Sequence, residues 1–170
     1  MSRDLPSYSQ LLDVSDPAYQ RRACGAASLA MLLGGCGLET PPSVDEVLAR
    51  GIEHEAYKEG VGWRHREMAT LARSFGVHAH HEDWSGDPDW AAWEHLVDLV
   101  ARGPVMASVT KDFSPSEDSH LVVICGIDDE QASIYDPFRD NREGIRYAVP
   151  VAFLKRHWTQ RVLCLHASRQ

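Results

Sequence analysis

One apolar segment constrains the fold of this chain more than any other. From Ala26 to Leu33 only Ser28 is polar, and the segment consists mainly of Ala, Leu and Met, which favour helix. A helix that is apolar on nearly every side is buried within a protein. The glycines that follow, at positions 34, 35 and 37, end the helix because glycine readily adopts the left-handed conformation. We therefore predict a buried central helix over residues 24–33.

Cys24 is the first residue of this predicted helix. The N–H groups of a first helical turn lack intrahelical partners and form the positive end of the helix dipole. This environment favours a thiolate over a thiol, so a cysteine placed there is a candidate nucleophile. The alternative is that Cys24 is a small hydrophobic residue of the core, which is the commoner role of a free cysteine.

Length and composition are typical of a globular protein. A chain of 170 residues with 44% hydrophobic and 25% charged residues can bury a sizeable core, and we expect one domain over residues 1–170. The net charge of −8 argues against binding to nucleic acid. No apolar run is long enough to span a membrane, and the start of the chain lacks the apolar core of a signal peptide. We expect a cytoplasmic protein without a membrane partner, or a domain of a larger one.

The four cysteines do not form a recognisable metal or disulfide pattern. They stand at positions 24, 36, 125 and 164, without CxxC spacing. A bridge between Cys24 and Cys36 conflicts with the helix, because twelve helical residues span about 18 Å. The histidines of residues 78–81 fall on alternate faces of a predicted strand, which does not favour a metal site. We therefore expect reduced thiols, no metal and no cofactor.

The hydrophobic periodicity changes along the chain from helical to strand-like. Residues 1–19 and the glycine-flanked segment 59–62 are predicted to be irregular. Helices followed by strands indicate an α+β domain with a mostly antiparallel sheet. The predicted helices are 24–33, 43–51, 63–75, 89–100 and a turn at 151–158, and the predicted strands are 77–80, 105–110, 120–127, 132–136, 145–149 and 161–166.

Two polar residues lie at the open end of one predicted hairpin. His120 begins the most apolar strand, Asp128 and Asp129 form the turn, and Asp136 ends the returning strand. Directly opposed side chains of such a hairpin have Cβ atoms about 4.5–5.5 Å apart. The Asp136 carboxylate is then expected to accept the Nδ1–H of His120 and leave Nε2 as a base. Together with Cys24, these residues could supply a nucleophile, a base and an orienting group.

Three motifs resemble one family of peptidases. Residues 24–32 resemble the nucleophile motif of the bacteriocin-processing (double-glycine leader) peptidase-like cysteine peptidases, a papain-like group. Residues 120–128 resemble the histidine motif of this family, and Asp136-Pro137 resembles its aspartate motif. The motifs occur in the order of the family, and the resemblance covers roughly residues 5–160. It implies a papain-like fold in which the nucleophile helix of an N-terminal helical half packs on a C-terminal antiparallel sheet.

The resemblance also implies a role for each motif residue. Cys24 would be the nucleophile, His120 the general base and acid, and Asp136 the group that orients His120. A glutamine before the cysteine would stabilise the oxyanion, but the usual spacing of six residues falls on Ala18. Gln10 resembles the Tyr-x-Gln element of members with a longer insert, and we favour it over Gln20, which is nearer to the cysteine.

The resulting functional prediction is a thiol-dependent hydrolase of peptide or amide bonds that resembles the stand-alone members of the family. One alternative keeps the Cys24 thioester but transfers the acyl group to an amine, which would make the protein an acyltransferase. Another is an inactive module on the same fold that binds peptides. A polar segment at 111–119, directly before His120, is expected to border the cleft. The expected partner is a peptide or amide substrate, and the sequence does not indicate an oligomeric state.

Overall fold

The structure, a computed structural model, describes residues 4–110 and 119–166. It combines six helices with two antiparallel sheets in these residues, so the predicted α+β class is confirmed. The helices are α1 (Pro17–Gln20), α2 (Cys24–Gly34), α3 (Val44–Glu53), α4 (His65–Ser74), α5 (Asp89–Arg102) and α6 (Val151–His157). The strands are β1 (Tyr57–Lys58), β2 (Gly62–Trp63), β3 (His78–Asp83), β4 (Val105–Thr110), β5 (Ser119–Ile127), β6 (Gln131–Tyr135), β7 (Arg146–Pro150) and β8 (Trp158–His166).

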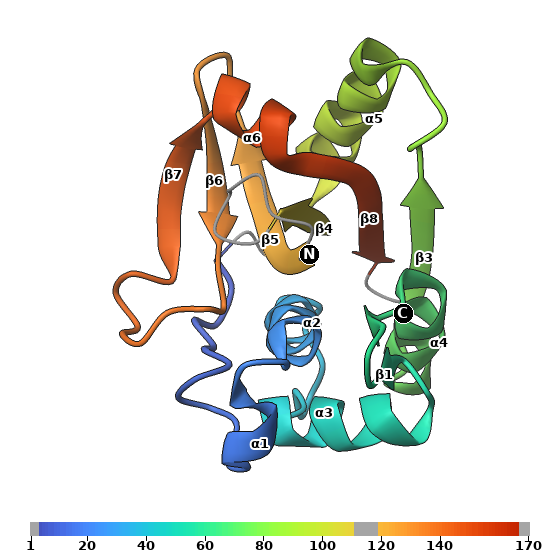
Figure 1. Cartoon of the computed structure of the whole chain (residues 1–170), viewed down its shortest axis with the longest axis vertical. Helices are drawn as coiled ribbons and strands as arrows, with labels where there is room; N and C mark the ends of the chain where they lie inside the picture. Colours follow the sequence, from blue (N-terminus) through green and yellow to red (C-terminus); the bar gives the residue numbers. More distant parts are fainter. Residues whose placement is uncertain (1–3, 111–118, 167–170) are drawn as a thin grey trace.

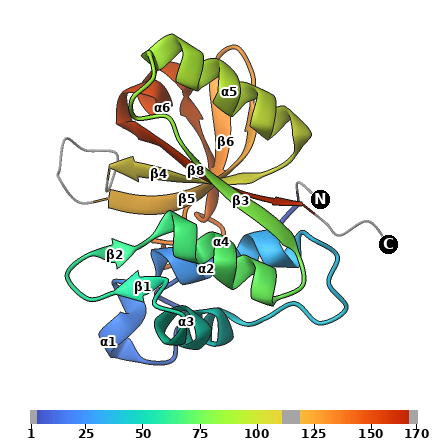
Figure 2. The same ribbon diagram turned by 90° about the vertical axis from the view of Figure 1, so that its right-hand side faces the viewer.

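The larger sheet separates two hydrophobic cores. Its strand order is β3-β8-β4-β5-β6-β7, and every neighbouring pair is antiparallel. Helices α2, α3 and α4 lie on one side of the sheet, and α5 and α6 lie on the other (Figures 1 and 2). Successive residues of β5 alternate between the two cores, with Leu121 and Val123 facing α2 and Val122 and Ile124 facing α5. This alternation explains why β5 is apolar along most of its length.

Helix α2 is the buried centre of the helical half. All residues from 25 to 33 are buried, and the hydroxyl of Ser28, the one polar side chain among them, donates a hydrogen bond to the Leu121 carbonyl at 3.0 Å. Burial of each large aliphatic side chain in this helix contributes roughly 1.5–3 kcal/mol. The helix therefore fixes Cys24 relative to β5, on which it packs.

The end of α2 differs from the predicted left-handed cap. Gly34 is still helical and Gly35 has a right-handed φ of −79°, whereas Gly37 is left-handed at +74°. Gly34 is required by packing instead, because a Cβ there would lie 2.7 Å from Pro6. The glycines still accompany the helix end: Gly34 allows close packing on Pro6, and Gly37, two residues after the C-terminal cap, forms a left-handed turn.

Other helix boundaries agree with the predictions within a few residues. Ser43 caps α3 by accepting the Glu46 N–H at 3.1 Å, as the capping signature predicts, but the helix continues past Gly51 to Glu53. Gly51 is tolerated inside the helix because it packs against the ring of Trp63. Asp89 does not cap α5, since Pro88 occupies that position.

Short elements account for most of the differences from the sequence prediction. The segment predicted as a loop around residues 59–62 connects β1 and β2, which form a hairpin of two strands with two residues each; Gly62 is already part of β2. Residues 17–20, predicted as irregular, form one helical turn capped by Asp16. Strand β8 begins at Trp158 rather than at 161 because its first residues still pair with β4 across a register shift. Among residues 4–110 and 119–166, no helix has the length and apolar character needed to cross a bilayer.

Candidate active site

Cys24 lies at the first position of α2, as predicted. Ala23 precedes it and provides no side-chain cap, so the thiol lies among first-turn N–H groups that no side chain caps. The side chain is half-buried and the cysteine is not in a disulfide. The thiol also interacts with the imidazole of His120. The structure therefore brings the candidate nucleophile and base together.

His120 and Asp136 form a direct hydrogen bond. The Nε2 atom of His120 lies 2.7 Å from Oδ1 of Asp136, and both side chains are buried. The predicted contact through Nδ1 is wrong, because the strand register places the two residues diagonally. A bulge between Ile124 and Gly126 puts Tyr135 opposite Val123, so Asp136 is one residue further along and not opposite His120. Diagonal residues of a hairpin are about 7–8 Å apart, so the carboxylate meets Nε2, the ring nitrogen further from the backbone. Nδ1 does not take part in this bond and is available to Cys24.

All described contacts of the Asp136 carboxylate are with hydrogen-bond donors. Oδ1 also accepts the Phe138 backbone N–H at 2.9 Å. Oδ2 accepts the Tyr147 hydroxyl at 3.1 Å and lies 3.0 Å from the Arg139 guanidinium. Burial alone would raise the pKa of Asp136, but these donors and the charges of His120 and Arg139 lower it to about 2. Asp136 is therefore ionised at neutral pH.

The same pair determines the protonation state of His120. Burial alone would lower its pKa, but the hydrogen bond with Asp136 and the interaction with Cys24 raise it to about 9. The imidazole is then positively charged at neutral pH, between an ionised carboxylate and a sulfur atom. This is the charge arrangement of an activated thiol, in which an imidazolium stabilises the thiolate.

The two candidate oxyanion glutamines differ in their surroundings. Gln10 is buried, its backbone N–H donates to the Pro137 carbonyl at 2.9 Å, and its Nε2 donates to the Gln20 carbonyl at 2.7 Å. An amide nitrogen carries two hydrogens, so this bond leaves one for another acceptor. The side chain of Gln20 instead donates to the Val14 carbonyl at 3.0 Å. Gln10 therefore reaches the loop before Cys24, whereas the amide of Gln20 is bonded back to the N-terminal segment.

A cavity of about 470 Å³ opens beside Cys24. One wall is Trp63, whose indole N–H donates to the Arg22 carbonyl at 2.7 Å and whose ring packs against Gly25 and Gly51. A Cβ on Gly25 would lie 2.4 Å from this ring, so the position after the candidate nucleophile has no room for a side chain. The cavity is lined by Arg21, Arg22, Cys24, Tyr57, Glu59, Gly60, Val61, Gly62, Trp63, His65, Ser108, Ser119 and Leu121. Residues 111–118, expected to border the cleft, lie outside the described residues.

Four residues of this region are not identified by the sequence reasoning: Trp63, His65, Arg139 and Tyr147. Glycines at positions 25 and 51, which leave space for a large ring, are a weak signal for Trp63. His65 is neutral at neutral pH, because burial and the nearby charges of Arg161 and His81 lower its pKa to about 4. No sequence pattern brings Tyr147 to Asp136, because this contact depends on the register of β6 and β7. Arg139 is three residues after Asp136, and this spacing is the one local signal for their contact.

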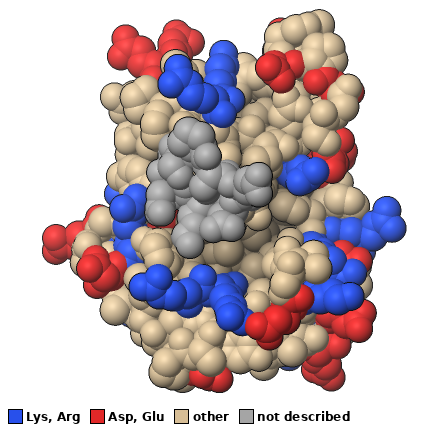
Figure 3. Space-filling view, in the orientation of Figure 1, with Lys and Arg blue, Asp and Glu red and all other residues tan. Residues whose placement is uncertain are grey.

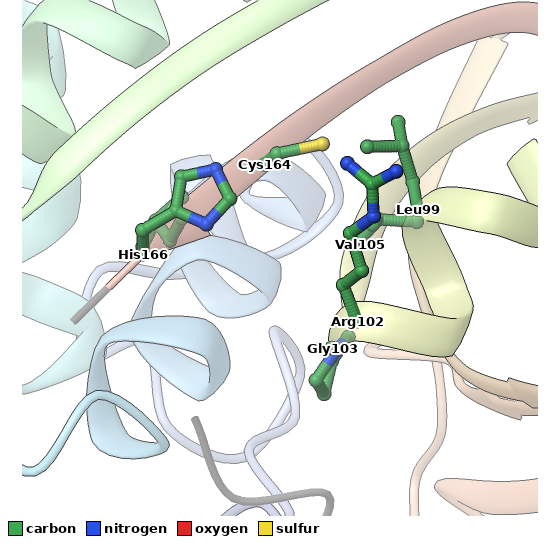
Figure 4. A pocket seen from close by; sticks show the side chains of 8 residues that line it. Leu99, Arg102, Gly103, Val105, Cys164 and His166 are labelled. Atoms are coloured by element: carbon green, nitrogen blue, oxygen red, sulfur yellow. The ribbon is translucent and has the colours of Figure 1, made fainter. Parts of the chain in front are cut away.

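A second cavity lies away from these residues, where the end of α5 meets β4 and β8 (Figure 4). It is lined by residues that include Arg102, Cys164 and His166. Burial raises the pKa of the Cys164 thiol to about 12, so this cysteine is unreactive at neutral pH. In the described part of the chain, no three His, Cys, Asp or Glu side chains are grouped to hold a metal ion.

Comparisons with known proteins agree with this geometry. The model of the Peptidase_C39-like family matches residues 2–162, which is nearly the whole sequence. The chain belongs to the Peptidase_C39-like family. This confirms the resemblance inferred from the three sequence motifs, and the family and fold support a cysteine peptidase function. No curated protein sequence matches the chain significantly.

Solved structures support the C39 assignment at the level of the fold. A protein from Bacillus anthracis described as a C39-like peptidase has a TM-score of 0.69 at 20% identity, over 99% of this chain and 96% of that chain. A double glycine motif protease from an AMS/PCAT transporter, solved with its leader peptide, has a TM-score of 0.62 at 20% identity, over 98% and 94%. The peptidase domain of Streptococcus ComA has a TM-score of 0.63 at 17% identity, over 87% and 93%. The papain-like fold is thereby confirmed.

Proposed function

We propose that this C39-like protein is a thiol-dependent hydrolase of peptide bonds that uses Cys24, His120 and Asp136. The observation that carries the proposal is the 2.7 Å hydrogen bond between His120 and Asp136, with the imidazole beside a cysteine at a helix start. We propose further that residues 1–170 form one peptidase domain.

The proposed reaction follows from the charges of these residues. The Cys24 thiolate attacks the substrate carbonyl, and the His120 imidazolium gives its proton to the leaving amine. Water, deprotonated by the now neutral His120, then hydrolyses the thioester. Asp136 stays ionised throughout and stabilises the imidazolium whenever it forms. The Cys24 backbone N–H and the free hydrogen of the Gln10 amide stabilise the tetrahedral oxyanion, and each such donor contributes about 3–4 kcal/mol.

The cavity beside Cys24 supports a peptide as the substrate. Its wall is rigid because Trp63 is hydrogen-bonded and packed between two glycines, and preformed cavities with aromatic walls are typical of binding sites. Basic and acidic side chains are interspersed on the face of the molecule shown in Figure 3, so the net negative charge is not concentrated there. A neutral or mixed-charge peptide can therefore approach this face. A leader peptide is bound by the double glycine motif protease. A cytoplasmic location stays a prediction from the sequence.

Cleavage of a proteome-derived peptide library tests this function. We expect the wild-type protein to produce new peptide termini with a shared sequence preference, and Cys24→Ala to produce none. New peptide products joined to an added amine, rather than hydrolysed products, would favour the acyltransferase alternative. Tight binding of library peptides without any product would favour the inactive module.

Cys24 is expected to be the most reactive thiol of the chain. It lies among uncapped first-turn N–H groups and beside an imidazolium, whereas burial raises the pKa of Cys36 and raises that of Cys164 to about 12. We expect iodoacetamide at neutral pH to modify Cys24 at least ten times faster than the other three cysteines. Mass mapping of the modified protein over time measures the rates. Equal rates at Cys24 and Cys36 would support the binding module instead.

The activity is expected to decline at alkaline pH. The imidazolium form of His120 protonates the leaving group, and this form is lost as the pH rises through the raised pKa of about 9. We therefore expect the alkaline limb of kcat/KM to have its midpoint near pH 9 rather than near the ordinary histidine value of about 6.5. A steady-state profile on an acyl substrate measures this limb. A midpoint near pH 6.5 would show that Asp136 and Cys24 do not stabilise the imidazolium.

A further inference from the structure

The second oxygen of the Asp136 carboxylate is held by two side chains that the proposed reaction does not use. Oδ2 accepts the Tyr147 hydroxyl at 3.1 Å and lies 3.0 Å from the Arg139 guanidinium. The guanidinium also donates to the Tyr147 hydroxyl at 2.6 Å and stacks 4.6 Å above the centre of its ring. Arg139, Tyr147 and Asp136 therefore form a closed triangle of contacts, in which Tyr147 accepts from the arginine and donates to the aspartate.

The directions of these hydrogen bonds do not change in the working pH range. Burial, together with the charge of Asp136, raises the pKa of Tyr147 to about 12, so its hydroxyl keeps its proton. Arg139 stays positively charged, since Asp136 and Tyr147 offset the effect of burial and raise its pKa. Both groups therefore remain donors to Oδ2. Because Oδ2 is the oxygen that does not bond His120, these two contacts fix the orientation of the carboxylate plane.

The segment that contains Asp136 and Arg139 is also fixed from the N-terminal side. The Ser9 hydroxyl donates to the Arg139 carbonyl, and the Gln10 N–H donates to the Pro137 carbonyl at 2.9 Å. Because Gln10 is the candidate oxyanion donor, the same short segment supports both the orienting carboxylate and the backbone of this donor. A shift of residues 136–139 would disturb both at once.

We infer that Arg139 and Tyr147 are positioning residues that hold Asp136 in the orientation in which it bonds His120. The inference rests on the proposed function of the triad. The titratable or charged groups that face this carboxylate are His120 from β5, Tyr147 from β7 and Arg139 from its own segment, with Cys24 of α2 beyond the imidazole. Neither Arg139 nor Tyr147 lines the cavity beside Cys24, so neither is expected to contact the substrate there.

The inference predicts the sign of two independent effects. With one donor fewer at Oδ2 the carboxylate becomes more basic and stabilises the His120 imidazolium more strongly, so the alkaline limb moves to higher pH. The carboxylate is also held less firmly, so kcat falls while KM changes little. We expect a loss of about tenfold or more in kcat for Tyr147→Phe, as for a lost hydrogen bond to a charged group. Arg139→Met should move the limb further, because it removes a full charge.

The experiment compares Tyr147→Phe, Arg139→Met and Arg139→Lys with the wild-type chain. Arg139→Lys keeps the charge, so its alkaline limb should stay closer to that of the wild type. Arg146→Met is the matched control: Arg146 is the neighbour of Tyr147 on β7 and is half-exposed. It forms an ion pair with Asp4 and lies 5.5 Å from the ring centre of Tyr135, and neither contact involves the Asp136 carboxylate. We expect this control to leave kcat and the pH profile unchanged. Thermal unfolding of each variant identifies any that fail to fold.

A titration of His120 followed by ¹⁵N NMR gives a readout that does not require turnover. The His120 signal is assigned from the signal missing in His120→Ala, and its pKa should be higher in Tyr147→Phe and Arg139→Met than in the wild type. An unchanged His120 pKa and unchanged kcat in both variants would overturn the inference. Failure of the proposed function has a different result, because turnover would then be absent in the wild type or kept by Cys24→Ala, whatever the pKa of His120.

Discussion

Replacement of Asp136 by asparagine is expected to reduce turnover by up to about four orders of magnitude while the protein stays folded. An amide has one oxygen and one nitrogen, whereas all four described contacts of the Asp136 carboxylate require an acceptor. If the NH₂ group faces His120, it donates to Nε2, and the proton moves to Nδ1 beside Cys24. If it faces the other way, it meets the donors of Arg139 and Tyr147. Neither orientation reproduces the stabilised imidazolium.

The loss should be accompanied by a change in the pH profile. Because the carboxylate contributes to the raised pKa of His120, its removal should move the alkaline limb below the pH of about 9 expected for the wild type. His120→Ala should abolish turnover. Asp140→Asn, four residues further along in an exposed turn, is the matched control and should keep full activity. Circular dichroism confirms folding. Activity of Asp136→Asn within tenfold of wild type would mean that a neutral group is sufficient to orient His120.

The second large effect concerns the oxyanion. Gln10→Ala should lower kcat by about two to three orders of magnitude, because it removes one donor to the tetrahedral intermediate. Gln20→Ala should have a much smaller effect, since its amide donates to the Val14 carbonyl. Steady-state turnover on an acyl substrate measures both changes.

Stability measurements separate this role from a purely structural one. Gln10 also donates to the Gln20 carbonyl, so its removal disturbs the loop before Cys24. Gln10→Glu keeps the length of the side chain but, when ionised, cannot donate to the oxyanion or to the Gln20 carbonyl, so it should lose as much kcat as the alanine variant. Denaturant unfolding reports the stability of each variant. A damaging Gln20→Ala together with a harmless Gln10→Ala would show that the glutamine nearer to the cysteine supplies the donor.

Much of the fold is predictable from local patterns. The apolar segment around Leu29 has few alternatives to a buried helix, and its first residue is then necessarily at a helix start. The hairpin of β5 and β6 is predictable because Asp128 forms a polar turn between two apolar strands; its Oδ1 accepts the Gln131 N–H at 2.7 Å. The hairpin alone is sufficient to bring His120 and Asp136 to the same end of the sheet.

Other parts of the site depend on tertiary contacts that have no local signal. The bulge between Ile124 and Gly126 changes the pairing at the catalytic end of the hairpin, and with it the ring nitrogen that meets Asp136. The short hairpin of β1 and β2 is too brief to have a periodicity, yet it carries Trp63 to Gly25. Tyr147 reaches Asp136 because Arg146 pairs with Tyr135 across β6 and β7, whereas Arg139 is three residues after Asp136 in the chain.

The most direct test of the account is the covalent intermediate. A single turnover with an activated acyl ester, stopped rapidly with acid, is analysed by tandem mass spectrometry of the tryptic peptide that covers residues 23–50. Fragmentation is needed because this peptide contains both Cys24 and Cys36. We expect the acyl group to be attached to Cys24, to appear before the acid product and to be absent in Cys24→Ser. Product formed at the wild-type rate by Cys24→Ser, or an acyl group only on Cys36, would contradict it.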